Sequence, residues 1–176
     1  ISDTAELFFE DLRIPVTQLL GGIEGQGFKQ LMSQLPYERT LLAVSAATAI
    51  EMAVELTVDY TQQRKAFGQT IADFQNTRFK LAECATTAHV VRSFVNDCIQ
   101  RLLDGTLENE AAYMAKWWCS EQQCKVMDEC LQLFGGYGFM EEYPIARMYT
   151  DARIQKIYGG TNEIMKDLIA RRMFAH

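Results

Sequence analysis

The sequence predicts an all-α fold, an antiparallel four-helix bundle, from three observations. Apolar residues recur at three- and four-residue spacing over several long segments, which is the period of an amphipathic helix. The glycines are confined to a few short clusters, and long glycine-free segments run between them. The connections between these segments are short, and short connections join antiparallel neighbours in helical bundles. The 176 residues suffice for one domain of this kind.

The first long helix is expected over residues 26–63, which contain no glycine after Gly27. Its apolar stripe begins at Leu41 and continues to Val58 at helical spacing. Pro36 lies inside this segment, where a proline removes one backbone donor and its ring clashes with the preceding turn. We therefore expect a kink or a break near Leu35.

The remaining helices are expected over residues 73–104, 108–134, 144–157 and 162–173. Asp73 is a suitable N-cap for the first of these, because its carboxylate can accept from the free N–H groups of the first turn. Gly135 follows the second and stops it. Pro144 fits the first turn of the third, and Thr161 caps the last.

The N-terminal strip differs from the rest of the chain. Residues 6–15 are short, rich in aromatic and apolar residues and end at Pro15, which favours a strand over a helix. A single strand cannot form a sheet, so we expect the chain to begin inside a larger protein. We divide it into residues 1–25, a remnant of a preceding domain, and residues 26–176, the helical domain.

The composition excludes several function classes. The net charge of −6 and the absence of a Lys/Arg cluster argue against nucleic acid as a partner. No apolar run approaches the roughly 18 residues of a membrane span, and no signal peptide is recognisable. The five cysteines are odd in number and form no Cys-x-x-Cys pair, which indicates reduced structural thiols and a reducing compartment.

A bundle can also hold a metal or serve only as an assembly module. A di-iron centre needs Glu-x-x-His pairs, and neither histidine follows a glutamate at that spacing, so we expect no metal. A non-catalytic oligomerisation bundle would explain the helical stripes. It would not explain the two glycine pairs, Gly135–Gly136 and Gly159–Gly160. A glycine turn before a helix N-terminus suits an anionic or carbonyl oxygen, although ordinary helix caps use the same residues.

Seven sequence blocks then resemble the C-terminal domain of the acyl-CoA dehydrogenase family. They are Gln63–Gln69, Gln75–Asn76, Lys80–Glu83, Leu131–Phe139, Tyr143–Ile145, Asp151–Arg153 and Ile157–Met165. Residues 6–21 resemble the last strand of the family's middle β-domain. The resemblance implies FAD-dependent α,β-dehydrogenation of an acyl-CoA thioester to the trans-2-enoyl-CoA. Electrons would pass to electron-transfer flavoprotein.

The position of the catalytic base distinguishes branches of this family. In the commonest pattern a glutamate follows the tyrosine of the last block, but here Gly159 follows Tyr158. The long-chain and isovaleryl branches carry the glutamate on the first long helix, before an arginine, and this sequence has Glu38–Arg39 there. The resemblance, which is greatest to the long-chain branch, therefore implies Glu38 as the base. Tyr37, Arg39, Tyr158, Gly159 and Gly160 would line the substrate site, with the Gly159 N–H donating to the thioester carbonyl.

The resemblance also assigns cofactor-binding residues. Arg64, Phe67 and Gln75 resemble residues that meet the FAD of a neighbouring subunit, and Gln132 and Gly136 lie in the matching glycine-rich turn. Thr161, Asn162 and Glu163 match the cap that touches FAD from the same chain, although several relatives have Gln in place of Glu163. We therefore expect a homodimer or homotetramer. The composition fits the cytoplasm of a bacterium and the mitochondrial matrix of a eukaryote equally, and acyl-chain length cannot be deduced from this part of the chain.

Overall fold

The computed structural model describes residues 5–174, which divide into two compact units between Gln34 and Leu35. The first unit contains two short 3-10 helices, η1 (Val16–Gln18) and η2 (Leu20–Gly22), and the start of helix α1. The strand expected over residues 6–15 is not formed, because a strand requires a hydrogen-bonded neighbour and the first unit offers none. Its apolar side chains are instead exposed to solvent, and Phe8 is 86% exposed.

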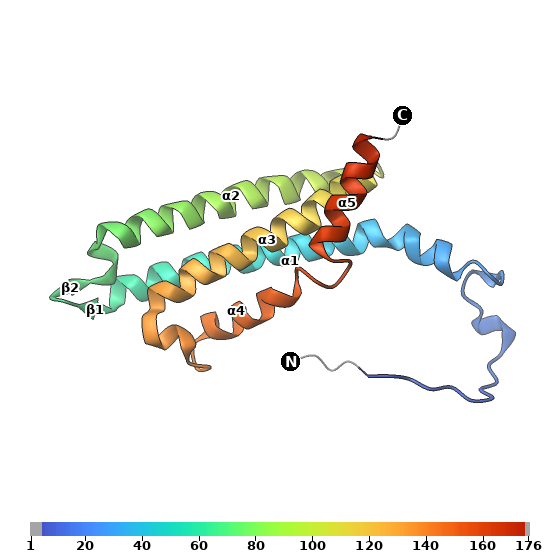
Figure 1. The fold of residues 1–176 in the computed structure, drawn as a ribbon, viewed down its shortest axis with the longest axis horizontal. Coiled ribbons are helices and arrows are strands. Elements are labelled where there is room, and N and C mark those ends of the chain that lie inside the picture. The colour runs from blue at the N-terminus through green and yellow to red at the C-terminus, as the bar shows by residue number, and fades with distance from the viewer. Residues whose placement is uncertain (1–4, 175–176) are drawn as a thin grey trace. The chain divides into compact units, whose positions relative to one another are not determined.

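The second unit confirms the predicted helical fold (Figure 1). Its elements are α1 (Gly27–Gln63, from Leu35 onward), α2 (Gln75–Leu103), α3 (Asn109–Phe134), η4 (Gly135–Phe139), α4 (Pro144–Ile154) and α5 (Asn162–Met173). Figure 1 shows α1 to α4 running lengthwise with alternating direction, as in an antiparallel bundle, and α5 crossing the end of α3. The fold thus has a fifth helix in addition to the four of the bundle.

Helix α1 corrects the expectation of a break near Leu35. It runs without interruption through Pro36, although the boundary between the two units falls beside this residue. The hydroxyl of Thr40 donates to the Pro36 carbonyl over 2.8 Å. Beyond this turn one face of α1 is buried in the bundle core, and such tertiary packing overrides local helix preference.

Two predicted helix boundaries also shift. The N-cap of α2 is Phe74, and the Asp73 carboxylate instead accepts from the backbone N–H and the hydroxyl of Thr70, over 3.0 and 2.7 Å. It therefore braces the short 3-10 helix η3 (Ile71–Asp73). Helix α4 ends at Ile154, three residues earlier than expected. Gly135 ends α3, and the Thr161 hydroxyl caps α5 by accepting from the Ile164 N–H, as predicted.

A small hairpin between α1 and α2 was not predicted. Strand β1 (Lys65–Ala66) pairs antiparallel with β2 (Gln69–Thr70). The turn residues Phe67 and Gly68 have φ of +53° and +83°, which a two-residue hairpin turn requires. Glycine adopts such angles freely, but a phenylalanine there is strained, and the side chain of Phe67 is 95% exposed.

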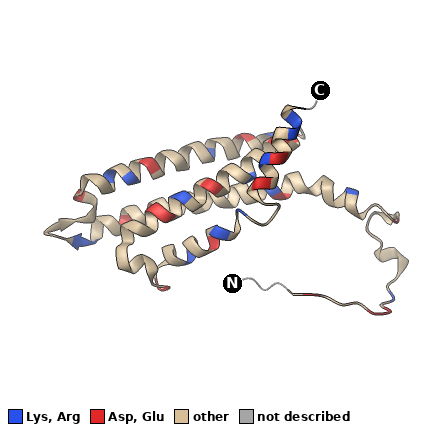
Figure 2. Ribbon diagram, in the orientation of Figure 1, with Lys and Arg blue, Asp and Glu red and all other residues tan. Residues whose placement is uncertain are grey.

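The core of the second unit consists mostly of small apolar residues. Helix α1 contributes a stripe of alanines, which allows neighbouring helices to approach closely, and α3 contributes Met127 and the two buried cysteines Cys119 and Cys130 among others. Ion pairs link the helices at the rim. Arg92 of α2 holds Glu51 of α1 through two hydrogen bonds, of 2.7 and 2.5 Å. Figure 2 shows charges of both signs distributed over the helices.

Helix α1 is also long and apolar enough to cross a membrane by length and composition alone. Its most apolar 18-residue window has a mean hydropathy of 1.7, and 33% of that window is buried. A core helix of a globular protein passes the same test, and Ala46 and Ile50 of α1 lie fully buried in the bundle core.

Candidate functional site

One half of the candidate site is the Gly159–Gly160 turn between α4 and α5. Both residues have positive φ, +66° and +93°. A Cβ atom at position 159 would lie 2.6 Å from Leu42 Cδ1, and one at position 160 would lie 2.8 Å from Met165 Cε. The positive φ angles favour glycine at both positions, and a Cβ atom at either would require the end of the Leu42 or Met165 side chain to shift. A glutamate at position 159, the commonest family pattern, would not fit this turn unless Leu42 moved.

Two cations hold the turn through its carbonyl oxygens. Arg39 of α1 donates from Nε to the Gly159 oxygen over 3.1 Å, and Lys116 of α3 donates from Nζ to the Gly160 oxygen over 2.7 Å. Arg39 is 6% exposed, and its guanidinium also lies 4.9 Å from the centre of the Tyr113 ring. Burial lowers the pKa of Arg39, whereas the neighbouring Tyr113 and Glu38 raise it.

The Gly159 N–H is not used within the fold. Among residues 5–174, no backbone carbonyl accepts a hydrogen bond from the N–H groups of Gly159, Gly160 and Thr161, whereas the Asn162 N–H donates to the Lys156 carbonyl. A free N–H beside the start of a helix is a donor for an anionic or carbonyl oxygen.

Glu38 lies on the side of α1 that faces this turn. It is four residues before Leu42, and residues four apart occupy the same helix face one turn from each other. The Leu42 side chain lies beside Gly159, and Glu38 is therefore one helical turn along α1 from the residue that lies beside Gly159. Glu38 and Tyr37 are both exposed. Tyr158, which precedes the turn, is 41% exposed.

The residues expected to follow the turn have distinct surroundings. Asn162 is 1% exposed, and its side-chain oxygen accepts from Lys116 Nζ over 3.0 Å and from Ser120 Oγ over 3.1 Å. Protein groups thus occupy the Asn162 side chain, so any contact with a cofactor would run through its backbone. Glu163 is exposed in the first turn of α5, and hydrogen bonds from its own backbone and from Thr161 lower its pKa.

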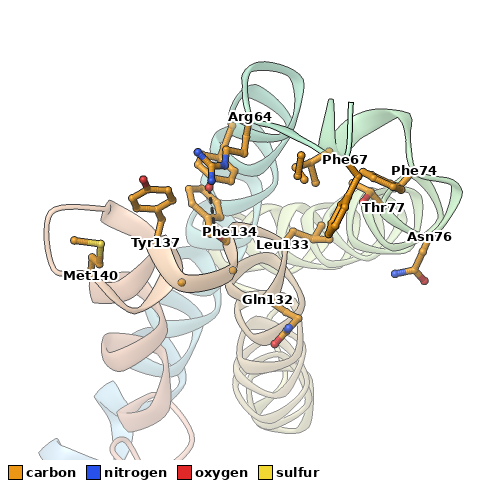
Figure 3. Close-up of a pocket in the computed structure, with 15 residues that line it drawn as sticks. Arg64, Phe67, Phe74, Asn76, Thr77, Gln132, Leu133, Phe134, Tyr137 and Met140 are labelled. Atoms are coloured by element: carbon orange, nitrogen blue, oxygen red, sulfur yellow. Dashed lines mark hydrogen bonds between the residues drawn. The ribbon is translucent and has the colours of Figure 1, made fainter. Parts of the chain in front are cut away.

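The other half of the candidate site is a cavity at the opposite end of α1 (Figure 3). Its volume is about 830 Å³, and it contains four of the predicted cofactor residues: Arg64, Phe67, Gln132 and Gly136. None of its lining residues is acidic. Gln75, which was predicted to bind the cofactor together with Arg64 and Phe67, does not line the cavity; it is exposed next to the lining residue Asn76.

This cavity has the features of a site for a phosphate-bearing aromatic ligand. The Arg64 guanidinium is the only cation among the lining residues and lies 5.1 Å from the centre of the Tyr137 ring. Phe67 and Phe74 meet edge to face with ring centres 6.4 Å apart, as Figure 3 shows. A Cβ atom at Gly135 or Gly136 would meet nothing within 4 Å, which leaves room for a ligand to approach the backbone.

The two halves lie far apart in one chain. Glu38 and Arg64 stand near the two ends of the same helix, and at 1.5 Å per residue they are separated by about 39 Å along it. No single small ligand can contact both ends. The structure thus places Arg39, the neighbour of Glu38 in the sequence, against the Gly159–Gly160 turn, and separately gathers Arg64, Phe67, Gln132 and Gly136.

Sequence reasoning missed Lys116, which holds the turn from inside the bundle. A signal was present, because Lys116 follows Ala112 by four residues and precedes Cys119 by three, which places it on the apolar face of α3. A lysine in such a stripe is ordinarily assigned to the solvent side. The structure shows that it is buried.

The family profile of the acyl-CoA dehydrogenase C-terminal domain matches residues 25–174. The chain belongs to the acyl-CoA dehydrogenase family.

Individual relatives agree with this assignment. The chain is 56% identical to the mitochondrial long-chain specific acyl-CoA dehydrogenase of Sus scrofa over 97% of its own length and 40% of that protein. The crystal structure of an acyl-CoA dehydrogenase from Geobacillus kaustophilus superposes with a TM-score of 0.91 at 45% identity, covering 96% of this chain and 44% of the other. An acyl-CoA dehydrogenase from Bacillus anthracis, solved in complex with FAD, gives a TM-score of 0.76 at 31% identity, covering 85% of this chain and 29% of the other. The chain spans less than half the length of these relatives.

Proposed function

We propose that this chain is the C-terminal domain of an FAD-dependent acyl-CoA dehydrogenase of the long-chain type, which converts acyl-CoA thioesters to trans-2-enoyl-CoA in fatty-acid or branched acyl oxidation. The observation that carries the proposal is the pairing of Glu38 with Gly159. A side chain at position 159 would require Leu42 to move, and Glu38 stands one helical turn from Leu42. The base is thereby supplied from α1.

In this proposal Glu38 removes the α-proton of the bound thioester. The proton moves to the carboxylate, while negative charge develops on the thioester carbonyl oxygen. The unused Gly159 N–H donates to that oxygen and stabilises the charge, and one such donor is worth about two to three orders of magnitude in rate. Binding of an acyl chain excludes water from the exposed Glu38, and this desolvation raises the pKa of a carboxylate toward the range that proton abstraction needs.

The cavity residues fit FAD, which when bound would accept the β-hydrogen of the substrate as hydride. Arg64 would hold the pyrophosphate, the aromatic side chains around Phe67 would contact the adenine, and Gln132 and Gly136 would form the adjacent turn. Gln75 stands at the rim. Thr161, Asn162 and Glu163 would meet the cofactor from the other half-site.

The separation of the halves supports a shared site between subunits. Because about 39 Å of helix divides Glu38 from Arg64 in one chain, one FAD can use both groups only when they come from different chains. We therefore propose a homodimer or homotetramer. The exposed apolar residues of α1 and of the first unit, Phe8 among them, would be covered by neighbouring subunits and by a preceding β-domain.

Residues 1–25 are the proposed remnant of that β-domain. Electron-transfer flavoprotein is the proposed electron acceptor, and neither nucleic acid nor a membrane span is part of the proposal. The porcine relative is a mitochondrial protein by name, which supports the matrix for a eukaryotic source; a bacterial source would place the protein in the cytoplasm. The 176-residue chain on its own would turn over nothing, since it lacks the domain that packs against the flavin ring.

The decisive experiment replaces Glu38 by Gln in a full-length enzyme, either the parent polypeptide or the porcine relative with this chain in place of its matching residues. Loss of a general base typically costs about 10²- to 10⁴-fold. We expect turnover of acyl-CoA by Glu38→Gln to fall at least that far with FAD content unchanged. Glu55→Gln is the matched control, because Glu55 is an exposed glutamate on the same helix.

Near-normal turnover by Glu38→Gln would refute the assignment of the base. An inactive but correctly folded, FAD-loaded wild-type enzyme would instead favour the second candidate, a non-catalytic assembly bundle that kept the fold. A panel of short, long and branched acyl-CoA substrates would then define the chain length.

A further inference from the structure

Lys116 is the largest fully buried side chain of the second unit and carries a charge. It is 1% exposed, and no carboxylate of residues 5–174 forms a salt bridge with it. A buried ammonium group without a counter-ion is costly for a fold. A neutral donor would hold the same carbonyls at lower cost, so the charge itself requires an explanation.

The ammonium group sits directly behind the Gly159–Gly160 turn. Lys116 Nζ donates to the Gly160 carbonyl and to the Asn162 side-chain oxygen, over 2.7 and 3.0 Å. Asn162 is itself anchored to α3 through Ser120. Lys116 thus fixes the carbonyl of Gly160, and Arg39 fixes the carbonyl of Gly159.

Arg39 and Lys116 therefore hold the two carbonyl oxygens of a turn that also carries the unused Gly159 N–H. Their field is positive where a negative oxygen would accept from Gly159, and fixed charges of this kind act strongly in a site that excludes water.

We propose that Lys116 is a positioning residue of the thioester site, which fixes the Gly159–Gly160 turn through the Gly160 carbonyl and Asn162 and places a positive charge behind the oxyanion donor. The inference rests on the proposed function. Lys116 does not touch the substrate, because the turn lies between them.

The ionisation of Lys116 agrees with this role. Burial, together with the guanidinium of Arg39 on α1, lowers its pKa to about 8, although Glu163 on α5 acts in the opposite direction. Glu121 of α3 and Lys156 pair with each other and reach this cluster through Asn162. With a pKa near 8 the ammonium form still predominates at pH 7, and a negative ligand beside it would raise that pKa.

The test is Lys116→Met in the full-length enzyme, with Lys80→Met as the matched control. Lys80 lies at the α2–α3 rim, where it pairs with Glu129 over 2.8 Å, and it is not among the residues that line the cavity or hold the Gly159–Gly160 turn. Each variant is assayed for turnover and FAD content. A second assay follows deuterium exchange at the α-carbon of a 3,3-dimethyl acyl-CoA of longer chain, whose β-carbon is bonded to two methyl groups and to two chain carbons. This compound has no β-hydrogen to lose, so the exchange reports proton removal alone.

We expect Lys116→Met to lower kcat and the exchange rate about 10- to 100-fold, less than loss of a direct oxyanion donor, with KM changed less than threefold and FAD content retained. Lys80→Met should stay within twofold of the wild type. Lys116→Gln, which keeps a neutral donor, should fall between Lys116→Met and the wild type.

Exchange and turnover of Lys116→Met within twofold of the wild type would overturn the inference while leaving the proposed function intact. A wild-type enzyme that neither exchanges nor turns over would overturn the proposed function instead. If Lys116→Met does not fold, Lys116→Gln is judged by the same criterion. Failure of both variants to fold would assign Lys116 to the stability of the bundle and refute the positioning role.

Discussion

Replacement of Gly159 by alanine measures how tightly the turn is built. The Gly159 backbone has φ of +66°, and its missing Cβ would lie 2.6 Å from Leu42 Cδ1. Gly105, after α2, supplies a matched control: its φ is +68°, and a Cβ there would meet nothing within 4 Å. The two sites therefore share the backbone cost and differ only in the contact with Leu42.

The expected magnitudes follow from these two terms. A left-handed backbone costs a residue with a Cβ about 1–2 kcal/mol, from which the lower entropy of the unfolded alanine chain recovers about 0.4–1 kcal/mol. Gly105→Ala should therefore lower the free energy of unfolding by about 1 kcal/mol. Overpacking adds about 1–3 kcal/mol, so Gly159→Ala should cost about 2–4 kcal/mol.

The assay is urea unfolding of the 176-residue chain, followed by far-UV circular dichroism at one fixed protein concentration. A double-mutant cycle with Leu42→Ala isolates the contact, and Gly159→Ala should cost about 1 kcal/mol in that background. Equal losses for Gly159→Ala and Gly105→Ala in the presence of Leu42 would show that the turn is not confined by this side chain. The steric argument for a base on α1 would then fail.

Two further predictions concern titrating groups. Because the pKa of Lys116 is lowered from 10.5 to about 8, the folded state binds fewer protons than the unfolded state between these values. The wild type should therefore gain stability relative to Lys116→Met as pH rises through this window, by at most about 3 kcal/mol; parallel curves from urea titrations at each pH would contradict it. Burial raises the pKa of the Cys119 thiol to about 12, and Cys84, Cys98 and Cys130 are also buried. Iodoacetamide at pH 8 should leave these four unmodified in the native chain and label them in urea, as read by mass spectrometry; rapid native labelling would show that the core opens readily.

The long helices could be predicted because their signals are local. Apolar spacing located α1, α2 and α3, and Gly135, Pro144 and Thr161 marked ends within a residue or so of the observed ones. No break forms at Pro36, because the local penalty of proline is outweighed by burial of the following turns, which a sequence does not display. The strand over residues 6–15 lacks a partner in the described chain.

The hairpin at 65–70 shows a different limit. Two-residue hairpin turns are recognised by Asn-Gly or Asp-Gly, and Phe67–Gly68 is an unusual pair for one. The strands are only two residues long, too short for an alternating pattern. The predicted role of Phe67 came from resemblance, and the structure adds that its backbone is strained and its ring is exposed.

Within the candidate site, the residue types indicated the Gly159–Gly160 turn and Glu38, but they did not indicate which side chains contact the turn. The contact of Leu42 with Gly159 and the hydrogen bond from Arg39 join residues about 120 positions apart. Such pairings depend on how α1 packs against the α4–α5 connection. Lys116 was missed for the same reason, since only the packed bundle shows that its charge lies inside.

The length of α1 between Glu38 and Arg64 has a consequence for the life of the protein in the cell. Under the proposed function, a newly made subunit carries a base without a cofactor at one end and a cofactor cavity without a base at the other. Such a subunit is chemically silent until it meets a partner. A defect confined to one half would then disable only the centre that uses that half. A subunit with a defective base and a subunit with a defective cavity could therefore assemble one intact centre between them.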